Sequence, residues 1–524
     1  MAAWYYPFAI GLTIVMSFVL SWIVKKYVKG LSDYYVMGRT ANWVLFTCTT
    51  TAAWMSMWTL LGGAGLVWAG WGPFSIESWF MGSVTGIVFF TFVLGPSLRR
   101  AGYLTIPDFF QDRFCSKRVR IAAVLALIVG TYFYIVLQVT GGAIIFEQMF
   151  GLSYKTAVVL YLLVVMVCIF ISGQWSVVVI DAFGFTAFML AGILWPIYMV
   201  RMAGGLHAAI TGAANLHGAA YWTLLGKSGA TTAQQLGNIL SWVIILGASP
   251  HLIAKSFIVK DTKQIYKGAI GTLISGTTLT FFLYLGFVAL VSLVKPGTVK
   301  PDYLAVHAAI KVAPPLLGCL YLMGAFMAGT TTANAQYMTC SQGLARDLYQ
   351  KLINPRATDQ QIIAITRIGL VLIAIATAII AFQKPWLLVI AGTITGMVFS
   401  FGYFPALALG IFWDRLTAKA VEIALWISVP VSVFAVYTWT KYKWFQPHPT
   451  IWGVLIGFAL LISLSYATRK TPEEEERWKS LKPVLWPKEP TLLREPSDRV
   501  FMIVAGIAAT GLAFVIIGLY RLWF

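Results

Sequence analysis

The chain has 524 residues, of which 59% are hydrophobic and only 11% are charged. Soluble domains carry about 25% charged residues, so this composition excludes an ordinary soluble enzyme, a disordered protein and a disulfide-stapled secreted domain. What remains is a polytopic membrane protein. The formal net charge of +19 does not call for a nucleic-acid partner, because membrane proteins concentrate Lys and Arg in their cytoplasmic loops.

A membrane helix needs about 20 apolar residues, and fourteen segments of the sequence satisfy this. They are residues 5–24, 42–70, 73–97, 120–148, 155–173, 176–202, 236–255, 268–294, 313–340, 361–382, 386–412, 418–440, 450–467 and 500–520. If they alternate across the membrane, most of the 38 Lys and Arg residues, Lys255 among them, fall on one face, which we expect to be cytoplasmic. Both termini and the long loop 204–235 then lie outside.

The second long loop, residues 468–499, should lie inside. Glu473 and Glu475 each stand four residues before a basic residue, Arg477 and Lys479. This spacing predicts a short helix with i,i+4 ion pairs. The loop is either a solvated linker or a docking surface for an accessory subunit.

Ionisable side chains at membrane depth are costly and mark functional sites. Two candidates emerge, Asp181 near the start of the sixth segment and His251 within the seventh. We expect a function for Asp181, whereas His251 is equally compatible with a buried core histidine. Pro250 removes a backbone donor and predicts a break in its helix. Transporters use such breaks to expose carbonyls that coordinate cations.

Hydroxyl groups mark two further spans. Four threonines lie between Thr47 and Thr51, where they compete for backbone hydrogen bonds and favour another interruption. Thr330, Thr331 and Thr332 lie in the middle of the ninth segment. Carbonyl and hydroxyl oxygens suit a hard cation such as Na⁺, but the same threonines could equally hydrogen-bond neighbouring helices.

Several stretches in chain order resemble the motifs of the sodium:solute symporter family. They are Asp33–Arg39, Gly102–Phe114, Ser249–Lys255, Thr331–Gln336 followed by Asp347–Tyr349, and Phe401–Pro405 followed by Phe412–Thr417. Each match is short. Their order and their spread over most of the chain make the resemblance specific.

The resemblance implies an all-α polytopic membrane protein with the five-plus-five inverted repeat of the LeuT-type fold. The implied units are an extra helix (1–30), the first repeat (31–203), an outer loop (204–235), the second repeat (236–417), two further helices (418–467), an inner loop (468–499) and a last helix (500–524). The interrupted second and seventh spans would then be the first helix of each repeat.

The resemblance also implies a Na⁺ site. Its two carbonyls from the first broken helix match Ala52 and Met55. Its ligands on the ninth span match the Ala328 carbonyl and the hydroxyls of Thr331 and Thr332.

The aspartate that the family links to cytoplasmic Na⁺ exit matches Asp181. Ile180 and Gly184 stand where the family has polar residues, so this exit path should be less polar.

For the substrate, the family's central cavity maps onto residues beside the two breaks. We expect walls from Trp54, Met57 and Trp58 and polar contacts from Ser56, Ser249 and His251. None of these residues is acidic, which disfavours an amine. A small monocarboxylate or similar anion is the first expectation.

These features predict a Na⁺-coupled symporter in a bacterial or archaeal plasma membrane, working on a small molecule and surrounded by lipid. A proton-coupled or passive carrier on the same fold is the alternative, and His251 keeps proton coupling open. A transporter-like sensor acting with a subunit at 468–499 is another. The sequence holds no HExxH motif and no nucleophile elbow, so we do not expect an enzyme.

Overall fold

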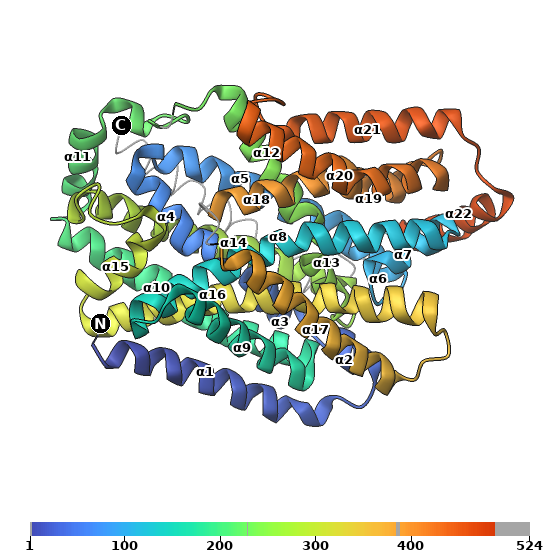
Figure 1. The fold of residues 1–524 in the computed structure, drawn as a ribbon, viewed down its shortest axis with the longest axis horizontal. Coiled ribbons are helices and arrows are strands. Elements are labelled where there is room, and N and C mark those ends of the chain that lie inside the picture. The colour runs from blue at the N-terminus through green and yellow to red at the C-terminus, as the bar shows by residue number, and fades with distance from the viewer. Residues whose placement is uncertain (1–2, 228, 384–387, 488–524) are drawn as a thin grey trace, which may run out of the picture.

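The computed structural model describes residues 3–227, 229–383 and 388–487, which form a bundle of helices (Figure 1). Twelve helices in these ranges are long and apolar enough to cross a membrane, and one bent pair makes a thirteenth span. The thirteen coincide with the first thirteen predicted segments. The last predicted segment, 500–520, lies outside the described residues, so the total of fourteen stays a prediction.

Five spans fall within the first predicted repeat. They are the bent pair α3 (Trp43–Trp54) with η3 (Trp58–Gly62), α4 (Gly63–Leu66) and η4 (Val67–Trp71); α5 (Pro73–Phe89) with η5 (Phe90–Leu94) and α6 (Gly95–Arg100); α8 (Lys117–Phe150); α9 (Tyr154–Ser172); and α10 (Gln174–Met202). The short helix α7 (Ile106–Phe114) lies between the second and third of them.

Five more spans fall within the second predicted repeat. They are α12 (Thr232–Ala248) with α13 (Pro250–Phe257); α14 (Thr262–Leu293); α16 (Pro315–Gln342) with η8 (Gly343–Ile353); α17 (Asp359–Ala381); and α18 (Leu388–Val398) with η9 (Phe399–Tyr403) and α19 (Phe404–Phe412). The helices η7 (Pro301–Tyr303) and α15 (Leu304–Lys311) precede α16.

The other elements lie outside the ten repeat spans. They are α1 (Tyr5–Val24), η1 (Lys25–Tyr27), α2 (Leu31–Val36), η2 (Met37–Arg39), α11 (Leu206–His217), η6 (Ala219–Trp222), α20 (Ala418–Tyr442), α21 (Pro449–Ala467) and α22 (Pro472–Leu485). In Figure 1 the N-terminus, α11 and α15 lie at one end of the bundle. The helices α6, α7 and α22 lie at the other end, here named the basic end.

The first helix of each repeat packs against the second helix of the other. Helix α3 runs along α14, and α12 runs along α5. The approach of α5 to α12 is close because two glycines face the partner. A Cβ at Gly82 or Gly86 would stand 2.4 Å from a carbonyl oxygen of α12. Small residues at such interfaces let membrane helices pack backbone to backbone. Helix α10 packs extensively on α16, and both helices carry predicted functional residues.

Candidate functional site

The first helix of the first repeat is interrupted without a proline. Helix α3 begins at the Asn42 cap, which accepts from the Leu45 amide at 3.0 Å. It ends at Trp54, because Met55 takes the extended conformation (φ −74°, ψ 129°). The two halves of the span are bent by 55°. The break leaves carbonyls at the end of α3 and amides at the start of the next half without helical partners.

The free amides beyond this break find partners nearby. The Trp58 amide donates to Ser56 Oγ at 3.2 Å, and the Met57 amide donates to Gln138 Oε1 of α8 at 3.0 Å. The second predicted break is also present. Helix α12 ends before Ser249 (φ −59°, ψ 120°), and Pro250 starts α13. Proline suits this first helical position, where its missing donor is not needed.

The free carbonyls of α3 face the hydroxyl run of α16. Thr332 Oγ1 lies 2.9 Å from the Met55 carbonyl oxygen, 3.0 Å from that of Ala328 and 3.3 Å from that of Ala52. Thr331 Oγ1 lies 3.0 Å from the Ala52 oxygen and 3.2 Å from the Ala328 oxygen. The five predicted Na⁺ ligands therefore come together, and we name them the oxygen cluster.

The oxygen cluster has more acceptors than protons. Each threonine hydroxyl carries one proton and two lone pairs. Yet the Thr332 hydroxyl also approaches the Ala53 oxygen at 3.4 Å, and that of Thr331 approaches the Met327 oxygen at 2.9 Å. Two protons cannot satisfy all these oxygens at once. Both threonines are fully buried, so a bound cation is a natural complement to this surplus of negative partial charge.

An ion pair lies beside the oxygen cluster. Lys255 Nζ of α13 contacts Asp181 Oδ2 of α10 at 2.7 Å, and both side chains are at most 1% exposed. The Thr49 hydroxyl of α3 donates to the same carboxylate oxygen. Asp181 Oδ1 has no hydrogen-bond partner among the described residues. One turn along α10, Gly184 packs so closely that a Cβ would stand 2.8 Å from Thr331 Cγ2.

This pair corrects one expectation. Lys255 was counted with the basic residues of the cytoplasmic face, but its ammonium is buried against Asp181. A lysine near the end of a span can snorkel to the membrane interface, so hydropathy alone gives no reason to bury it within the helix bundle. The structure adds Lys255 to Asp181 and His251 as a buried ionisable residue of a candidate membrane span.

The structure divides the predicted substrate residues into two groups. Trp58 packs on Trp242 of α12 with ring centroids 4.7 Å apart. Trp54 instead stacks on Phe80 of α5 at 4.9 Å. Met57 packs against two glycines. A Cβ added at Gly141 of α8 would stand 2.6 Å from the Met57 side chain, and one added at Gly329 of α16 would stand 2.2 Å from it. Trp54 and Met57 therefore fill helix interfaces rather than joining Trp58.

Three residues that no sequence motif marks, Tyr134, Gln138 and Trp242, gather with three predicted residues, Trp58, Ser249 and His251. We name these six residues the Trp58 group. Tyr134 lies edge-on to His251 at 5.9 Å and to Trp242 at 6.5 Å between ring centroids. Gln138 follows one turn later on α8. Aromatic and amide residues inside an apolar span look like core packing in the sequence, and only their convergence identifies them.

Unpaired polar atoms concentrate in this group. Trp58 Nε1, Gln138 Nε2, Ser249 Oγ and both ring nitrogens of His251 are buried without a hydrogen-bond partner among the described residues. Burying a polar group without a partner is costly, so such a concentration points to a ligand. Most of these atoms are donors or can donate, and none belongs to an acid.

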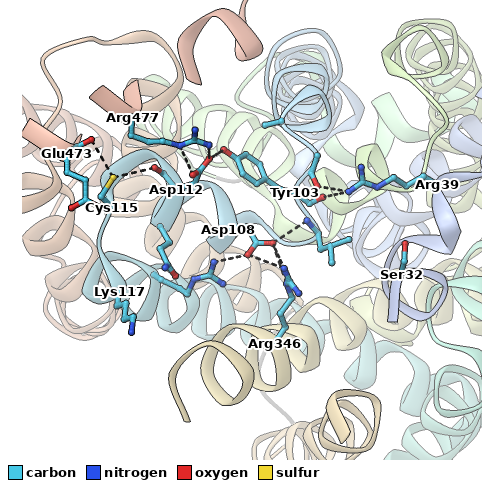
Figure 2. A pocket seen from close by; sticks show the side chains of 15 residues that line it. Ser32, Arg39, Tyr103, Asp108, Asp112, Cys115, Lys117, Arg346, Glu473 and Arg477 are labelled. Carbon is cyan, nitrogen blue, oxygen red and sulfur yellow. Dashed lines mark hydrogen bonds and ion pairs between the residues drawn. The ribbon is translucent and has the colours of Figure 1, made fainter. Parts of the chain in front are cut away.

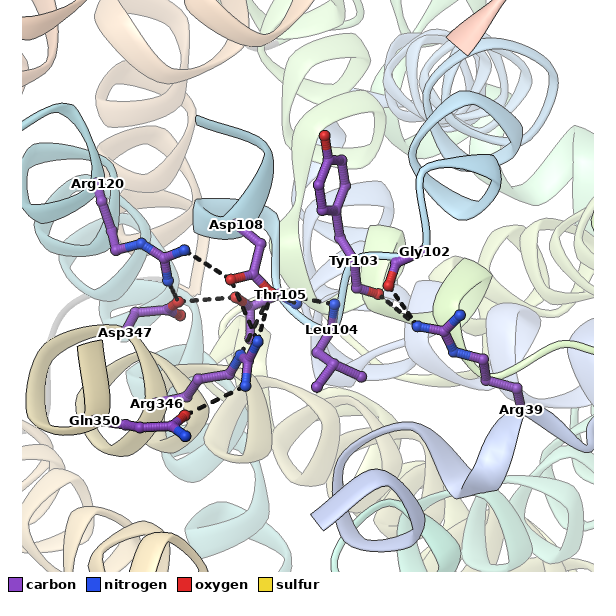
Figure 3. Close-up of polar contacts among 10 residues, drawn as sticks. All are labelled: Arg39, Gly102, Tyr103, Leu104, Thr105, Asp108, Arg120, Arg346, Asp347 and Gln350. Carbon is purple, nitrogen blue, oxygen red and sulfur yellow. Dashed lines mark hydrogen bonds and ion pairs between the residues drawn. The ribbon is translucent and has the colours of Figure 1, made fainter. Parts of the chain in front are cut away.

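A second polar cluster surrounds α7 at the basic end, beside a cavity of about 950 Å³ (Figure 2). Asp108 of α7 contacts Arg120 at 2.7 Å and Arg346 at 3.2 Å (Figure 3). Arg120 also contacts Asp347 at 2.5 Å, and the Thr105 hydroxyl donates to Asp347 at 2.9 Å. Burial alone would raise the pKa of Asp108, but Arg346 and Arg120 outweigh it and hold that pKa below its usual value.

This cluster connects the two helices that build the oxygen cluster. Arg39, shortly before α3, donates to the Gly102 carbonyl at 2.5 Å (Figure 3). Arg346 and Asp347 extend from α16 through η8. Three motifs far apart in the sequence thus meet at α7. We name Arg39, Asp108, Arg120, Arg346 and Asp347 the α7 hub.

Comparison with known proteins gives consistent matches. Residues 34–427 match the family described as "Sodium:solute symporter family". The sodium/pantothenate symporter of Haemophilus influenzae is 25% identical over 88% of this chain and 96% of its own length. The sodium/proline symporter of the same organism is 23% identical over 86% of this chain and 92% of its own length.

Solved structures share the fold. A Na⁺-coupled sialic acid symporter, solved in a substrate-bound outward-open state, covers 90% of this chain and 99% of its own, with a TM-score of 0.75 at 14% identity. MhsT in complex with L-phenylalanine reaches a TM-score of 0.50 over 76% of this chain. The all-helical fold is therefore of the LeuT type.

Proposed function

Because the chain belongs to the sodium:solute symporter family, we propose that it is a secondary active transporter in which Na⁺ drives the uptake of a small organic solute by alternating access. The basic end would face the cytoplasm and both termini the outside of a bacterial or archaeal plasma membrane. One observation carries the proposal: carbonyls of α3 and α16 converge with the Thr331 and Thr332 hydroxyls.

In this proposal Na⁺ binds the Ala52, Met55 and Ala328 carbonyls and the two threonine hydroxyls. The ion would fix the end of α3 against α16. The next residues of the broken helix, Ser56 to Trp58, lead to the Trp58 group. Substrate binding would be easier once the ion has fixed this backbone, and by reciprocity the substrate would tighten Na⁺ by the same factor.

Asp181 would line the route by which Na⁺ leaves toward the basic end. The hydroxyl of Thr49, one turn before Ala52 on α3, donates to Asp181 and so joins this carboxylate to α3. Since the Lys255 ammonium already neutralises this carboxylate at 2.7 Å, we expect one Na⁺ per substrate.

For the substrate we propose a small monocarboxylate. Trp58, Gln138, Ser249 and His251 would supply its hydrogen bonds, because their polar atoms are buried and unpaired. The rings of Tyr134 and Trp242 would hold its apolar part. A carboxylate paired with Na⁺ would cross as a nearly neutral unit.

Thermal unfolding of the purified protein in Na⁺, compared with K⁺ and choline at equal ionic strength, tests the ion site. Na⁺ at about 100 times its dissociation constant should stabilise the wild type by about 2.7 kcal/mol. The shift should vanish in Thr331→Ala/Thr332→Ala and remain in Thr330→Ala, whose hydroxyl points to Tyr161 instead. An equal Na⁺ shift in the double variant would contradict the site.

The alternative on the same fold is proton coupling through His251, which the unpaired ring nitrogens favour. It predicts no Na⁺-specific shift in the wild type. It predicts instead a pH-dependent ligand shift that is lost in His251→Ala.

The substrate proposal is tested by the same assay with candidate ligands added in Na⁺. Small monocarboxylates should stabilise the wild type, and choline should not. Gln138→Glu keeps the acceptor for the Met57 amide but replaces the donor with a charge, so it should abolish the carboxylate shift and leave the Na⁺ shift. An amine that stabilises the wild type while carboxylates do not would overturn the assignment.

A further inference from the structure

Helix α22 belongs to the loop predicted as a linker or a docking surface, and it packs on its own chain. Trp478, Leu481 and Leu485 are at most 4% exposed. The expected Glu475–Lys479 pair forms at 2.9 Å. Arg477 does not take Glu473 as its partner but reaches α7, where its Nε and Nη2 donate to the two carboxylate oxygens of Asp112 at 2.7 Å each (Figure 2). One face of α22 is thus committed to intramolecular contacts.

One set of α22 contacts holds the end of the third predicted span and α7. Arg100 of α6 donates to the Leu485 carbonyl at 3.0 Å. The Arg113 guanidinium of α7 lies 3.8 Å from the centroid of the Trp478 ring. Asp112 in turn accepts from the Tyr103 hydroxyl at 2.6 Å, next to the carbonyl of Gly102 that Arg39 binds.

The other set holds the turn between α19 and α20. Lys482 Nζ contacts the Asp414 carboxylate at 2.7 and 2.8 Å, and Trp478 Nε1 donates to it at 2.9 Å. Glu474 accepts from the Ala418 amide at the start of α20 at 2.9 Å. Trp486 donates to the Ile411 carbonyl at 3.0 Å. Helix α22 therefore bridges α6 and α7 to the end of the second predicted repeat.

We propose that α22 is a conformational clasp that keeps the basic end closed while it is docked and must release for that end to open. The oxygen cluster is shared by α3 and α16, so an opening from it toward the basic end would part these two helices. Both helices are tied to α7 through the α7 hub, so α7 must yield. Docked α22 ties α7 to Asp414 and Ala418, which lie outside α3 and α16. It therefore opposes the movement of α3 away from α16.

The protein contains its own reporter for this clasp. Cys115 lies between α7 and α22, with Sγ 3.9 Å from the Asp112 carbonyl oxygen and 3.8 Å from that of Glu473. We would replace Cys48, Cys168, Cys319 and Cys340 by serine or alanine. The labelling rate of Cys115 by a bulky polar maleimide in detergent then measures how often α22 lifts away.

Arg477→Glu should accelerate labelling about threefold to tenfold, since a partly exposed bidentate pair stabilises by roughly 1 kcal/mol. Burial raises the pKa of the Cys115 thiol, Glu473 and Asp112 raise it further, and Arg477 lowers it. Removing Arg477 would therefore slow the reaction if α22 stayed docked. Faster labelling can come only from greater exposure.

Lys479→Glu is the matched control, because it makes the same charge change on the exposed face of α22, where the Lys479 side chain is 73% exposed. It should label at the wild-type rate. If Arg477→Glu does not fold, Lys482→Glu breaks the opposite end of the clasp at Asp414 and should have the same effect. The exchange Arg477→Asp/Asp112→Arg should return the rate toward wild type.

The clasp goes beyond the proposed function. Only the Na⁺ dependence of Cys115 labelling rests on that function. Na⁺ should slow labelling of the wild type, and this effect should disappear in Thr331→Ala/Thr332→Ala while the Arg477→Glu acceleration persists. No Na⁺ effect on the wild-type rate, or an undiminished one in Thr331→Ala/Thr332→Ala, would count against the ion site and leave the clasp standing. Equal rates in Arg477→Glu and Lys479→Glu, with both variants folded, would overturn the clasp.

Discussion

The oxygen cluster and the α7 hub join the same two helices, α3 and α16, with opposite chemistry. In the oxygen cluster, backbone carbonyls face the hydroxyls of Thr331 and Thr332, and all the groups are neutral. In the α7 hub, Asp108 and Asp347 are held by arginines. One cluster lies at the break in α3, and the other lies at the basic end.

This difference in charge determines whether a cluster can lose a binding partner at low cost. When a cation leaves, the Thr331 and Thr332 hydroxyls can donate to two of the carbonyls, and the oxygens that stay unpaired carry only partial charge. A buried ion pair that loses one partner leaves an uncompensated charge, which costs about 3–5 kcal/mol. A mobile ion therefore belongs at the oxygen cluster, and a fixed mechanical joint belongs at the α7 hub.

The Asp181–Lys255 pair gives the severest test of this contrast, because it places fixed charges beside the neutral oxygen cluster. Asp181→Asn should destabilise the fold by about 3–5 kcal/mol, since Lys255 is left buried and unpaired. Lys255→Met should do the same, and Asp181→Asn/Lys255→Met should recover most of the loss. Thermal unfolding of the three variants measures this. Additive losses in the double variant would show that the pair is not coupled.

Asp302 in η7 shows what burial does to a carboxylate that lacks the arginine partners of Asp108. Burial raises its pKa to about 6, from about 3.9 in an unfolded chain. The folded state thus favours the protonated acid, so stability falls as pH rises from 4 through 6. Asp302→Asn should stabilise the protein by about 1–3 kcal/mol at pH 8 and leave it unchanged at pH 4.

Asp108→Asn should show the opposite pH dependence in the same unfolding series. Its lowered pKa contributes stability above the unfolded value, and that contribution is lost as pH falls through the folded value. The gap between wild type and Asp108→Asn should therefore be widest near neutral pH and close in acid. Parallel profiles for the Asp302 and Asp108 variants would refute the assignment of both shifts.

Gly184→Ala tests how tightly the oxygen cluster is positioned. The added Cβ would stand 2.8 Å from Thr331 Cγ2 and 3.0 Å from Met327 Cε, so the hydroxyl must shift. Overpacking of this kind costs about 1–3 kcal/mol, and Na⁺ affinity should fall about tenfold. Gly192→Ala on the same helix meets Leu279 instead and should leave Na⁺ affinity unchanged. Equal Na⁺ affinity in Gly184→Ala and Gly192→Ala would argue against Thr331 as a Na⁺ ligand.

Thr105→Ala has the smallest expected effect. It removes a hydrogen bond to Asp347 at 2.9 Å and the cap of α7. A loss of about 1 kcal/mol in unfolding free energy is expected, with an unchanged Na⁺ shift. Thr105→Ser should retain most of the stability. A Na⁺ shift that falls with Thr105→Ala would mean that the α7 hub and the oxygen cluster do not act separately.

Much of the fold follows from the sequence because membrane helices are set by local hydropathy. Both helix breaks were also predictable, one from Pro250 and one from the threonines before Met55. The positions of the five oxygen-cluster residues came from family motifs. Their convergence is a property of the fold, and spacing alone does not reveal it.

The missed features all depend on distant partners. Lys255 meets an aspartate 74 residues away, so no local pattern distinguishes it from an interfacial lysine. Arg477 has a good local partner in Glu473, yet tertiary packing gives it Asp112, 365 residues away. Gln138 is recognisable only once its side chain is seen to accept from the Met57 amide.

Direct binding of radioactive Na⁺ to the purified protein tests the central claim most directly. Wild type and Thr330→Ala should bind Na⁺ saturably, in competition with unlabelled Na⁺ but not K⁺. Thr332→Ser should retain binding because it keeps the hydroxyl, and Thr332→Ala should lose it. Undiminished binding in folded Thr332→Ala, or no saturable binding in the wild type, would contradict the oxygen cluster as the Na⁺ site.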